Sequence, residues 1–572
     1  MTRDHRLLHR RVAMAALAAC CGTAQAFTFE AGNVRGNFDS TLTLSAGMRL
    51  KNPSCSLVGD LTYCDAADVF RWGSGDDGNL NYRRHDIFTT YLKGNHELLL
   101  NFPDNWKFLG RVNWLYDFKA DDTARTPLSS DAKGEVVRDV RLLDLWVGKT
   151  MQFADGRRAG LRLGNQFLNW GESLFLPGGI NSTNAIDIQR LSQPGLQLKE
   201  AFLPAPMINA SAALGNGVSA EAYYQFHWNR TKFPPVGGYW SVVDLYDKGR
   251  QPIYLGPDPA SAAAMGEPEF PSIGWAPDVK PRNSGQWGVA LRWEPKGTSA
   301  NFGLYALNYH DKTPNLQFIN GQSEAQWTFL EDRKLFGASV SFPVGNWAIG
   351  AEVSYRPKDA ISLSGCYDPA MVGDNVAGLA PAAACNQYID GKRWQMHVTG
   401  LLSLTPGDHG ALLDMLGADT ATLLAEAVLI RYPGLKSVYY RSAPDGTPVA
   451  QVPAAGLWGW SNDGGATVYG AGTPTSWGIN FDFSWVYDGS IIPGWQVTPG
   501  LYYFQAMSGR TPNLAATFMK GARVANFYVL FTQNPANWQI GVNMARYGGG
   551  KDPFDQPLGD RSFVGAFLSR NF

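Results

Sequence analysis

The sequence predicts an all-β fold: a single transmembrane antiparallel β-barrel of about 18 strands, roughly 16–18. Three observations lead to this fold class: the composition, the alternation of polar and apolar residues, and the sorting of connections into short and long. Aromatic residues make up 13% of the 572 residues, charged residues only 17%, and 63 residues are Gly. Barrel strands present lipid with every second side chain only, so a membrane barrel can have this composition without a long apolar run.

Alternation with a period of two residues is the strand signal. In 476–487, for example, Trp477 and Trp485 share one face with apolar residues, and Asn480 and Asp482 share the other. Eight to ten such residues, at about 3.3 Å each and tilted by about 40°, span roughly 20–25 Å of membrane. Tryptophan and tyrosine at both ends of the apolar faces are typical of an aromatic girdle at each membrane surface.

The connections between predicted strands alternate in length. Four are tight turns: 102–105, 215–216, 343–345 and 534–537. Four are long loops: 51–85, 229–284, 357–391 and 432–475. Outer-membrane barrels have short periplasmic turns and long external loops, whereas a β-sandwich has no reason to sort its loops in this way. One connection on the predicted periplasmic side, 405–419, is long, and we expect it to carry a short helix.

The two ends of the chain predict export and barrel assembly. Four arginines precede an apolar run and the small-residue site Ala24-Gln25-Ala26, so residues 1–26 are predicted to be a signal peptide. A lipoprotein signal ending at Cys20 is the alternative. Residues 27–38 then form a short periplasmic segment, and 39–572 form the barrel. The last strand ends in Phe572, a pattern typical of the signal that the barrel-assembly machinery reads.

Cysteine spacing predicts two local disulfides in external loops. Four cysteines remain after residue 26, as the near-neighbour pairs Cys55–Cys64 and Cys366–Cys385. A disulfide connects parts of a loop that has no core of its own, and it requires an oxidising compartment. Two local pairs are the simplest of the three possible connectivities. A four-cysteine zinc site would need closer ligand spacing, so we expect no metal and no cofactor.

Composition and motifs argue against several function classes. Removal of residues 1–26 leaves 45 basic and 49 acidic side chains, and this net charge of −4 gives no support for nucleic-acid binding. The common nucleophile, zinc-protease and phosphate-loop motifs are absent from the sequence. We therefore expect no enzyme, although a serine paired with His96 is kept open as a hydrolase alternative.

Residues 170–204 interrupt the alternation with an amide-rich, irregular stretch. Strand side chains cannot fill a barrel of about 18 strands, and irregular backbone at membrane depth is tolerated inside protein or beside water. We expect this segment to fold into the lumen as a constriction; the alternative is an ordinary outer loop. Residues expected to build the constriction are Asn165, Gln166, Asn169, Trp170, Glu172, Asn181, Asn184 and Asp187. Arginines expected to line the lumen and to meet Glu172, Asp187 and Glu200 are Arg49, Arg111, Arg162, Arg292, Arg356 and Arg393.

Several motifs across the mature chain resemble one family. "GNQFLNWGES", "LKEAFLP", "YYQFHWNRTKFPPVGGYWS", "YALNYHDKTP" and "GDRSFVGAFLS" are similar to segments of domain-of-unknown-function family 1302, the large outer-membrane barrels of Gram-negative bacteria. The resemblance implies a setting with a second, periplasmic family and RND-type exporters. It also implies the handling of hydrophobic or lipid-like molecules.

From these observations we expect a passive outer-membrane channel for small hydrophobic or amphipathic compounds. Its environment would be outer-membrane lipid and lipopolysaccharide. The alternative is an outer-membrane docking or assembly component that works with a periplasmic partner protein and an RND-type exporter.

Overall fold

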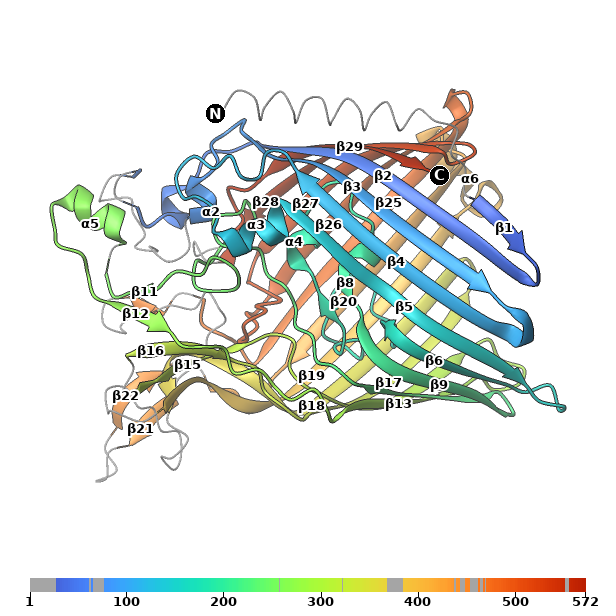
Figure 1. Ribbon diagram of the computed structural model, residues 1–572, viewed down its shortest axis with the longest axis horizontal. Helices are drawn as coiled ribbons and strands as arrows, with labels where there is room; N and C mark the ends of the chain where they lie inside the picture. Colours follow the sequence, from blue (N-terminus) through green and yellow to red (C-terminus); the bar gives the residue numbers. More distant parts are fainter. Residues whose placement is uncertain are drawn as a thin grey trace.

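The wall of the molecule is one closed ring of eighteen antiparallel strands (Figure 1). The computed structural model describes residues 27–60, 63–64, 77–256, 258–320, 323–367, 384–436, 439–442, 448–452, 461–462, 467–468, 470–550 and 555–572. The predicted signal peptide lies outside these residues. The strands of the wall are β2 (Val34–Arg49), β3 (Ile87–Asn101), β4 (Trp106–Asp117), β5 (Arg138–Gln152), β6 (Arg158–Gln166), β9 (Ala205–Gly215), β10 (Val218–Gln225), β13 (Gln286–Trp293), β14 (Asn301–Tyr309), β17 (Arg333–Val344), β18 (Trp347–Tyr367), β19 (Ala384–Leu404), β20 (Thr420–Arg431), β25 (Thr475–Ile492), β26 (Trp495–Ser508), β27 (Ala522–Gln533), β28 (Trp538–Gly549) and β29 (Phe563–Asn571).

The first and last wall strands close the ring. β29 pairs with β2 from Thr41↔Asn571 to Arg49↔Phe563, and every other wall strand pairs with its neighbour in sequence. Closure removes the sheet edges, so strand pairing on both sides supplies partners for the backbone polar groups of the wall, as a lipid environment requires. The predicted fold class is confirmed.

Alternate side chains of the wall face opposite environments. On β19, Met396 and Val398 are 45% and 56% exposed, whereas Gln395 and His397, which alternate with them, are buried. The outward side chains therefore form an apolar belt, and the inward side chains are polar. Tryptophans lie among the exposed wall residues, as the aromatic girdles require. None of the helices in the described part of the chain is long and apolar enough to span a membrane.

The barrel begins earlier than the sequence predicted. β2 starts at Val34, and its Arg35 already pairs with Asn101 of β3. β1 (Phe27–Ala31) folds back on β2 as a hairpin, from Phe27↔Phe38 to Ala31↔Val34. The predicted boundary after residue 38 is wrong because this hairpin extends the strand toward the periplasm.

The short and long connections lie at opposite ends of the barrel (Figure 1). The short-turn end carries β1, the C-terminus and α6 (Pro406–Leu416), the helix expected in the long turn. The remaining elements belong mostly to the long loops: η1 (Cys55–Leu57), α2 (Asp77–Leu80), η2 (Pro103–Asn105), α3 (Ser130–Val136), β7 (Ala185–Ile186), α4 (Ile188–Leu191), η3 (Leu198–Glu200), β8 (Phe202–Leu203), β11 (Ile253–Tyr254), α5 (Pro259–Met265), β12 (Ser272–Trp275), β15 (Asn315–Ile319), β16 (Glu324–Thr328), β21 (Tyr439–Ser442), β22 (Pro448–Val452), β23 (Ser461–Asn462) and β24 (Thr467–Val468).

The loop between β10 and β13 folds back over the outer mouth of the barrel. Its Tyr239 stacks on Phe88 of β3 with ring centroids 3.7 Å apart, and Trp240 packs against Phe563 of β29. Farther along the same loop, Leu245 belongs to a buried cluster with wall residues of β18, β20 and β26. The outer mouth therefore has an apolar core of its own.

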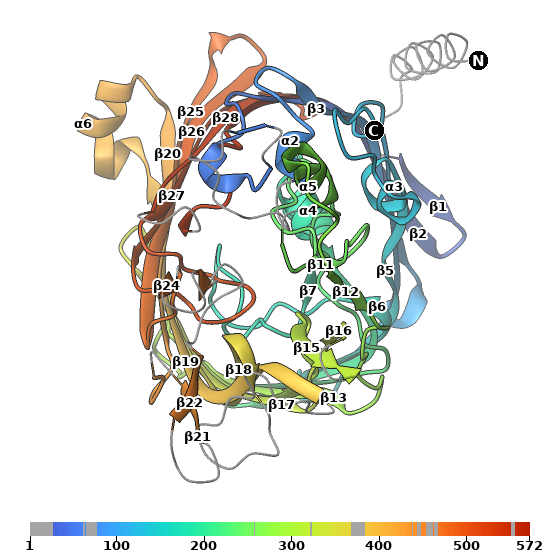
Figure 2. The same cartoon turned by 90° about the vertical axis from the view of Figure 1, so that its left-hand side faces the viewer.

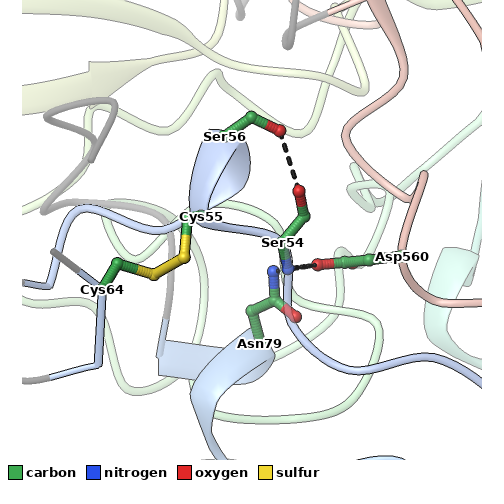
Figure 3. Close-up of a disulfide and its surroundings, with 6 residues drawn as sticks. All are labelled: Ser54, Cys55, Ser56, Cys64, Asn79 and Asp560. Atoms are coloured by element: carbon green, nitrogen blue, oxygen red, sulfur yellow. Dashed lines mark hydrogen bonds between the residues drawn. A yellow bond between two sulfur atoms is a disulfide. The ribbon is translucent and has the colours of Figure 1, made fainter. Parts of the chain in front are cut away.

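A disulfide ties the first outer loop, as predicted. Cys55 and Cys64 are bonded, and the neighbouring Ser54 donates its backbone N–H to Asp560 at 2.7 Å (Figure 3). Asn79 donates to the same carboxylate at 2.8 Å. These contacts fix the loop to the last outer connection. The side chains of Cys366 and Cys385 lie outside those that the structure describes.

Candidate functional site

Residues 170–204, here called the crossing segment, lie inside the ring of strands. Figure 2, which looks into the barrel from the long-loop end, shows α4 and β7 of this segment within the wall. The segment leaves the end of β6 and returns to β9, which pairs directly with β6. Its contacts define its path inside the barrel, because its two halves bind different strands of the wall.

The first half of the crossing segment is held by two wall carboxylates, here called the acidic anchor: Glu352 of β18 and Glu426 of β20. Glu352 accepts the backbone N–H of Glu172 at 2.6 Å and that of Ile180 at 3.0 Å. Both bonds are charge-assisted, and they are buried. Burial, followed by the negative charge of Glu352, raises the pKa of the Glu172 carboxyl.

Glu426 binds three consecutive backbone N–H groups. It accepts from Leu174 at 3.2 Å and from Phe175 and Leu176 at 2.9 Å each. His397 of β19 lies between the two carboxylates, with Nδ1 2.8 Å from Glu426 Oε1 and Nε2 3.9 Å from Glu352 Oε1. A backbone turn without regular secondary structure thus has its donors satisfied by the wall.

The carbonyl groups of the same turn are bound by neighbouring wall side chains. Gln395 donates to the carbonyl of Pro177 at 3.2 Å. Arg356 donates to the carbonyls of Gly178 and Gly179 and, at 2.7 Å, to Ser182 Oγ. Donors and acceptors of residues 172–182 are therefore both fixed to β18–β20.

The second half binds the opposite part of the wall. Asp187 caps α4 by accepting the N–H of Arg190 at 2.7 Å, and its carboxylate pairs with Arg141 of β5. Arg190 in turn reaches Asp139 of β5 at 2.9 Å and Asn113 of β4 at 3.3 Å. These contacts place α4 against β4 and β5.

The end of the segment is fixed to β3 by a buried ion pair and to β2 by a hydrogen bond. Lys93 Nζ lies 2.7 Å from Glu200 Oε2, and both side chains are almost fully buried. Lys93 also donates to the carbonyl of Gly195 at 3.1 Å, and Ser45 donates to that of Pro194 at 3.1 Å. Since β2–β5 and β18–β20 lie on different sides of the ring in Figure 2, the segment crosses the inside of the barrel.

The predicted amide side chains mostly bind to one another and to the backbone within residues 168–184. Asn181 donates to Asn169 at 3.0 Å, and Asn184 donates to Asn181 and to the carbonyl of Leu168, each at 2.5 Å. Gln166 and Asn165 bind backbone carbonyls of β9 and β5 instead. The amides thus shape the turn, whereas the wall carboxylates hold it.

Trp170 joins the segment to the wall beside β10. Its indole N–H donates to Glu221 at 2.9 Å, and its ring packs against Tyr223 and Tyr305 at centroid distances of 5.3 and 5.9 Å. Glu221 also accepts from Arg292 at 2.8 Å.

The six predicted arginines do not form the expected pairs with Glu172, Asp187 and Glu200. Asp187 pairs with Arg141, and Glu200 pairs with Lys93. Five of the arginines instead pair with carboxylates of the wall or the loops: Arg49 with Asp560, Arg111 with Glu97 and Asp144, Arg292 with Glu221, and Arg356 and Arg393 with Asp359. Arg162 donates to the amide oxygen of Asn209 at 3.5 Å. Arg356 contacts the segment through the carbonyls of Gly178 and Gly179 and through Ser182 Oγ, and not through a carboxylate.

Apolar side chains of the segment face the open part of the lumen. Leu174, Leu191 and Leu198 are 43%, 47% and 57% exposed. Because the segment lies inside the barrel, an exposed side chain on it faces the lumen. Phe175 is partly exposed and lies 5.6 Å, between ring centroids, from Tyr502 of β26.

The wall beyond Phe175 carries partly exposed aromatic rings on its inner face. Tyr502 donates to Asn480 at 2.9 Å, and Tyr528 of β27 donates to Asp482 at 2.7 Å, so the hydroxyl groups are satisfied and the rings are fixed. Only glycine fits beneath the second ring, because a Cβ on Gly500 would lie 2.3 Å from Tyr528. Phe175, Tyr502 and Tyr528 are called the aromatic stripe below.

The crossing segment is also linked to the outer loop between β10 and β13. The backbone N–H of Lys232 donates to the Ile186 carbonyl at 2.9 Å, and the N–H of Ile188 donates to the Lys232 carbonyl at 2.9 Å. The two inward-folded loops therefore share a short β-bridge.

The serine beside His96 is Ser40, at 2.9 Å from Nδ1. His96 Nε2 accepts the indole N–H of Trp114 at 2.9 Å. A neutral ring that accepts at Nε2 carries its proton on Nδ1, so it donates to Ser40 and cannot take the serine proton. This pair does not have the arrangement of a nucleophile and its base.

The acidic anchor was missed by the sequence reasoning, although a signal was present. Glu426 stands alone in "TLLAEAVLIR", and Glu352 stands alone in "AIGAEVSYRP". In each strand the carboxylate occupies an inward position between apolar residues. A lone carboxylate at such a position requires a partner inside the barrel.

None of the curated proteins matches the sequence. Among solved structures, OccAB4 and OccAB1 of Acinetobacter baumannii are 11% and 9% identical, with TM-scores of 0.40 and 0.42. OpdK of Pseudomonas aeruginosa, solved with vanillate, is 10% identical with a TM-score of 0.37. Each alignment covers 94% of this chain and 97%, 96% and 98% of the respective relative.

The sequence model of a family described as a protein of unknown function, DUF1302, matches residues 7–572. This range includes every wall strand and the crossing segment. The chain therefore belongs to the DUF1302 family.

Proposed function

We propose that this protein is a passive outer-membrane channel for small hydrophobic or amphipathic compounds, with the crossing segment as its constriction. The observation that carries the proposal is the contact between the partly exposed Phe175 ring and Tyr502 of the wall, next to Leu174, which is 43% exposed. Half-exposed apolar groups gathered in one place mark a binding surface rather than ordinary wall.

The outer-membrane location is supported by the wall itself. An outward apolar belt, short turns at one end and long loops at the other are the features of barrels in that membrane. The short-turn end then faces the periplasm, and the long loops face the exterior.

Passage would occur by diffusion along the aromatic stripe. The rings offer apolar faces, and the hydroxyl groups of Tyr502 and Tyr528 are already bound to Asn480 and Asp482. A solute would therefore replace water on an apolar surface without breaking these bonds. Several weak contacts along the path allow a solute to bind and to leave, which conduction requires.

The experiment is uptake by vesicles that contain the purified mature protein. Entry of a small apolar fluorophore should exceed that of a sugar of similar size, and Phe175→Ala should reduce the difference several-fold. Equal entry of both solutes would contradict the apolar preference. Entry of neither would overturn the channel and favour the docking component that works with a periplasmic partner and an exporter.

A further inference from the structure

In the described part of the chain, one connection at the short-turn end is long: residues 405–419, between β19 and β20. It contains α6, and its sequence favours a helix at this position. Pro406 occupies the first turn, and Gly417 ends the helix with φ 62°, a left-handed conformation that favours glycine. The N–H of Ala418 bonds back to the Leu413 carbonyl at 2.9 Å. The start and the end of the helix are therefore both specified by residues of the turn itself.

One side of α6 packs on the outside of the barrel. Leu413 is buried against Leu402 and Leu404 of β19 and Ala421 of β20. Leu402 and Leu404 continue the outward face of Val398, yet they are buried whereas Val398 is 56% exposed. The helix therefore covers wall positions that would otherwise face lipid, and Figure 2 shows it outside the ring of strands.

The helix lies at the height of the periplasmic aromatic girdle. Trp347 and Trp485 pack against the same cluster. The Trp485 indole N–H donates to the hydroxyl of Tyr487 at 3.2 Å, and this hydroxyl donates to the Leu416 carbonyl at 2.8 Å. Tryptophan and tyrosine occupy the boundary between headgroups and acyl chains in membrane barrels.

Exposed apolar side chains lie on the far side of α6 and on one of its flanks. Met415 is 75% exposed and Leu412 is 36% exposed. At 100° per residue, Met415 points away from the wall, opposite to Leu413, while Asp414 and Leu412 lie on the two flanks between them. The helix carries Asp408 and Asp414 and has no Lys or Arg.

We infer that α6 is an interfacial membrane helix, seated in the periplasmic leaflet with Met415 and Leu412 in contact with phospholipid. The apolar wall that α6 covers is itself the lipid-facing surface, so lipid that surrounds Val398 also reaches a helix lying flat on that surface. Because α6 has no Lys or Arg, its contact depends on apolar burial and not on anionic headgroups. This contact is independent of whether the lumen conducts.

The test uses the full mature protein in vesicles of phosphatidylethanolamine and phosphatidylglycerol at a 3:1 ratio. Met415→Cys is labelled with an environment-sensitive fluorophore in a Cys366→Ser, Cys385→Ser background. The matched control is Asp414→Cys, one residue away on the flank of the helix. Correct barrels are verified by heat-modifiable migration, and iodide is supplied on both sides of the membrane.

Doxyl-labelled phospholipid should quench the Met415→Cys label at least twofold more than the Asp414→Cys label, and iodide should show the reverse order. Replacement of phosphatidylglycerol by phosphatidylcholine should leave both values unchanged. Quenching of the Met415→Cys label by iodide as strongly as the control would overturn the inference. Protection from both quenchers would also overturn it, because a second protein surface would then cover the helix.

Discussion

The carboxylate of Glu426 accepts the backbone N–H of Phe175 at 2.9 Å, and this bond joins wall strand β20 to the turn that carries the partly exposed Phe175 ring. The same carboxylate accepts the N–H groups of Leu174 and Leu176. Glu352 accepts those of Glu172 and Ile180, on either side of this turn. The position of an apolar contact surface in the lumen therefore depends on two buried charges.

Glu426→Gln should loosen the crossing segment without unfolding the wall. A neutral amide oxygen forms weaker hydrogen bonds than a carboxylate, by about 1 kcal/mol each, and its NH2 group cannot accept. Loss of about 1–3 kcal/mol lowers the equilibrium constant for docking by roughly 5- to 150-fold. Single-channel recordings should show a larger and noisier open current. Asp482→Asn, an inward carboxylate that binds Tyr528 instead, is the matched control and should retain the wild-type current.

Tyr528→Ala should lower uptake of an apolar solute, because it removes one ring of the aromatic stripe. The neighbouring Phe527→Ala provides the control: Phe527 is 48% exposed on the lipid-facing side of the same strand. We expect a several-fold loss for the first variant and no change for the second, measured as initial rates in vesicles. Equal losses in both variants would show that the strand, and not the lumen surface, is responsible.

The buried pair Lys93–Glu200 should behave as a coupled unit. Lys93→Met leaves the Glu200 carboxylate buried without its cation, which costs about 3–5 kcal/mol. Hydrogen exchange of residues 187–200 should then accelerate by about two to three powers of ten. Lys93→Met combined with Glu200→Met should recover most of the protection. Hydrogen exchange as fast in the double variant as in the single variant would contradict the pairing.

Lowering the pH should stabilise the docked crossing segment through Glu172. The pKa of this carboxyl is raised by burial and by Glu352, so the docked state binds a proton more tightly than the free segment. The docked state therefore gains stability as the pH falls from this raised pKa toward the ordinary glutamate value, and loses it as the pH rises again. Current noise should decrease over that window in the wild type. Glu172→Gln should remove this dependence, and an unchanged pH profile in the variant would contradict the assignment.

Sequence patterns predicted the wall far better than the lumen. Alternation predicted the strand at residues 476–487, which lies within β25 (Thr475–Ile492), because this signal is local. The start of β2 was missed because its first residues, from Val34, are ordered by pairing with β1 and β3, and this pairing is not a local signal. Partners inside the lumen depend on which strands face each other across the ring. That is why Asp187 and Glu200 were expected to meet the wrong cations, and why Glu352 and Glu426 were overlooked.

Deletion of residues 172–198 tests the central claim most directly, because it removes the crossing segment and leaves every wall strand intact. In planar bilayers the deletion variant should conduct several-fold more current than the wild type, with less noise. A single-channel conductance equal to that of the wild type would contradict the account, since the segment would then not limit flow through the barrel.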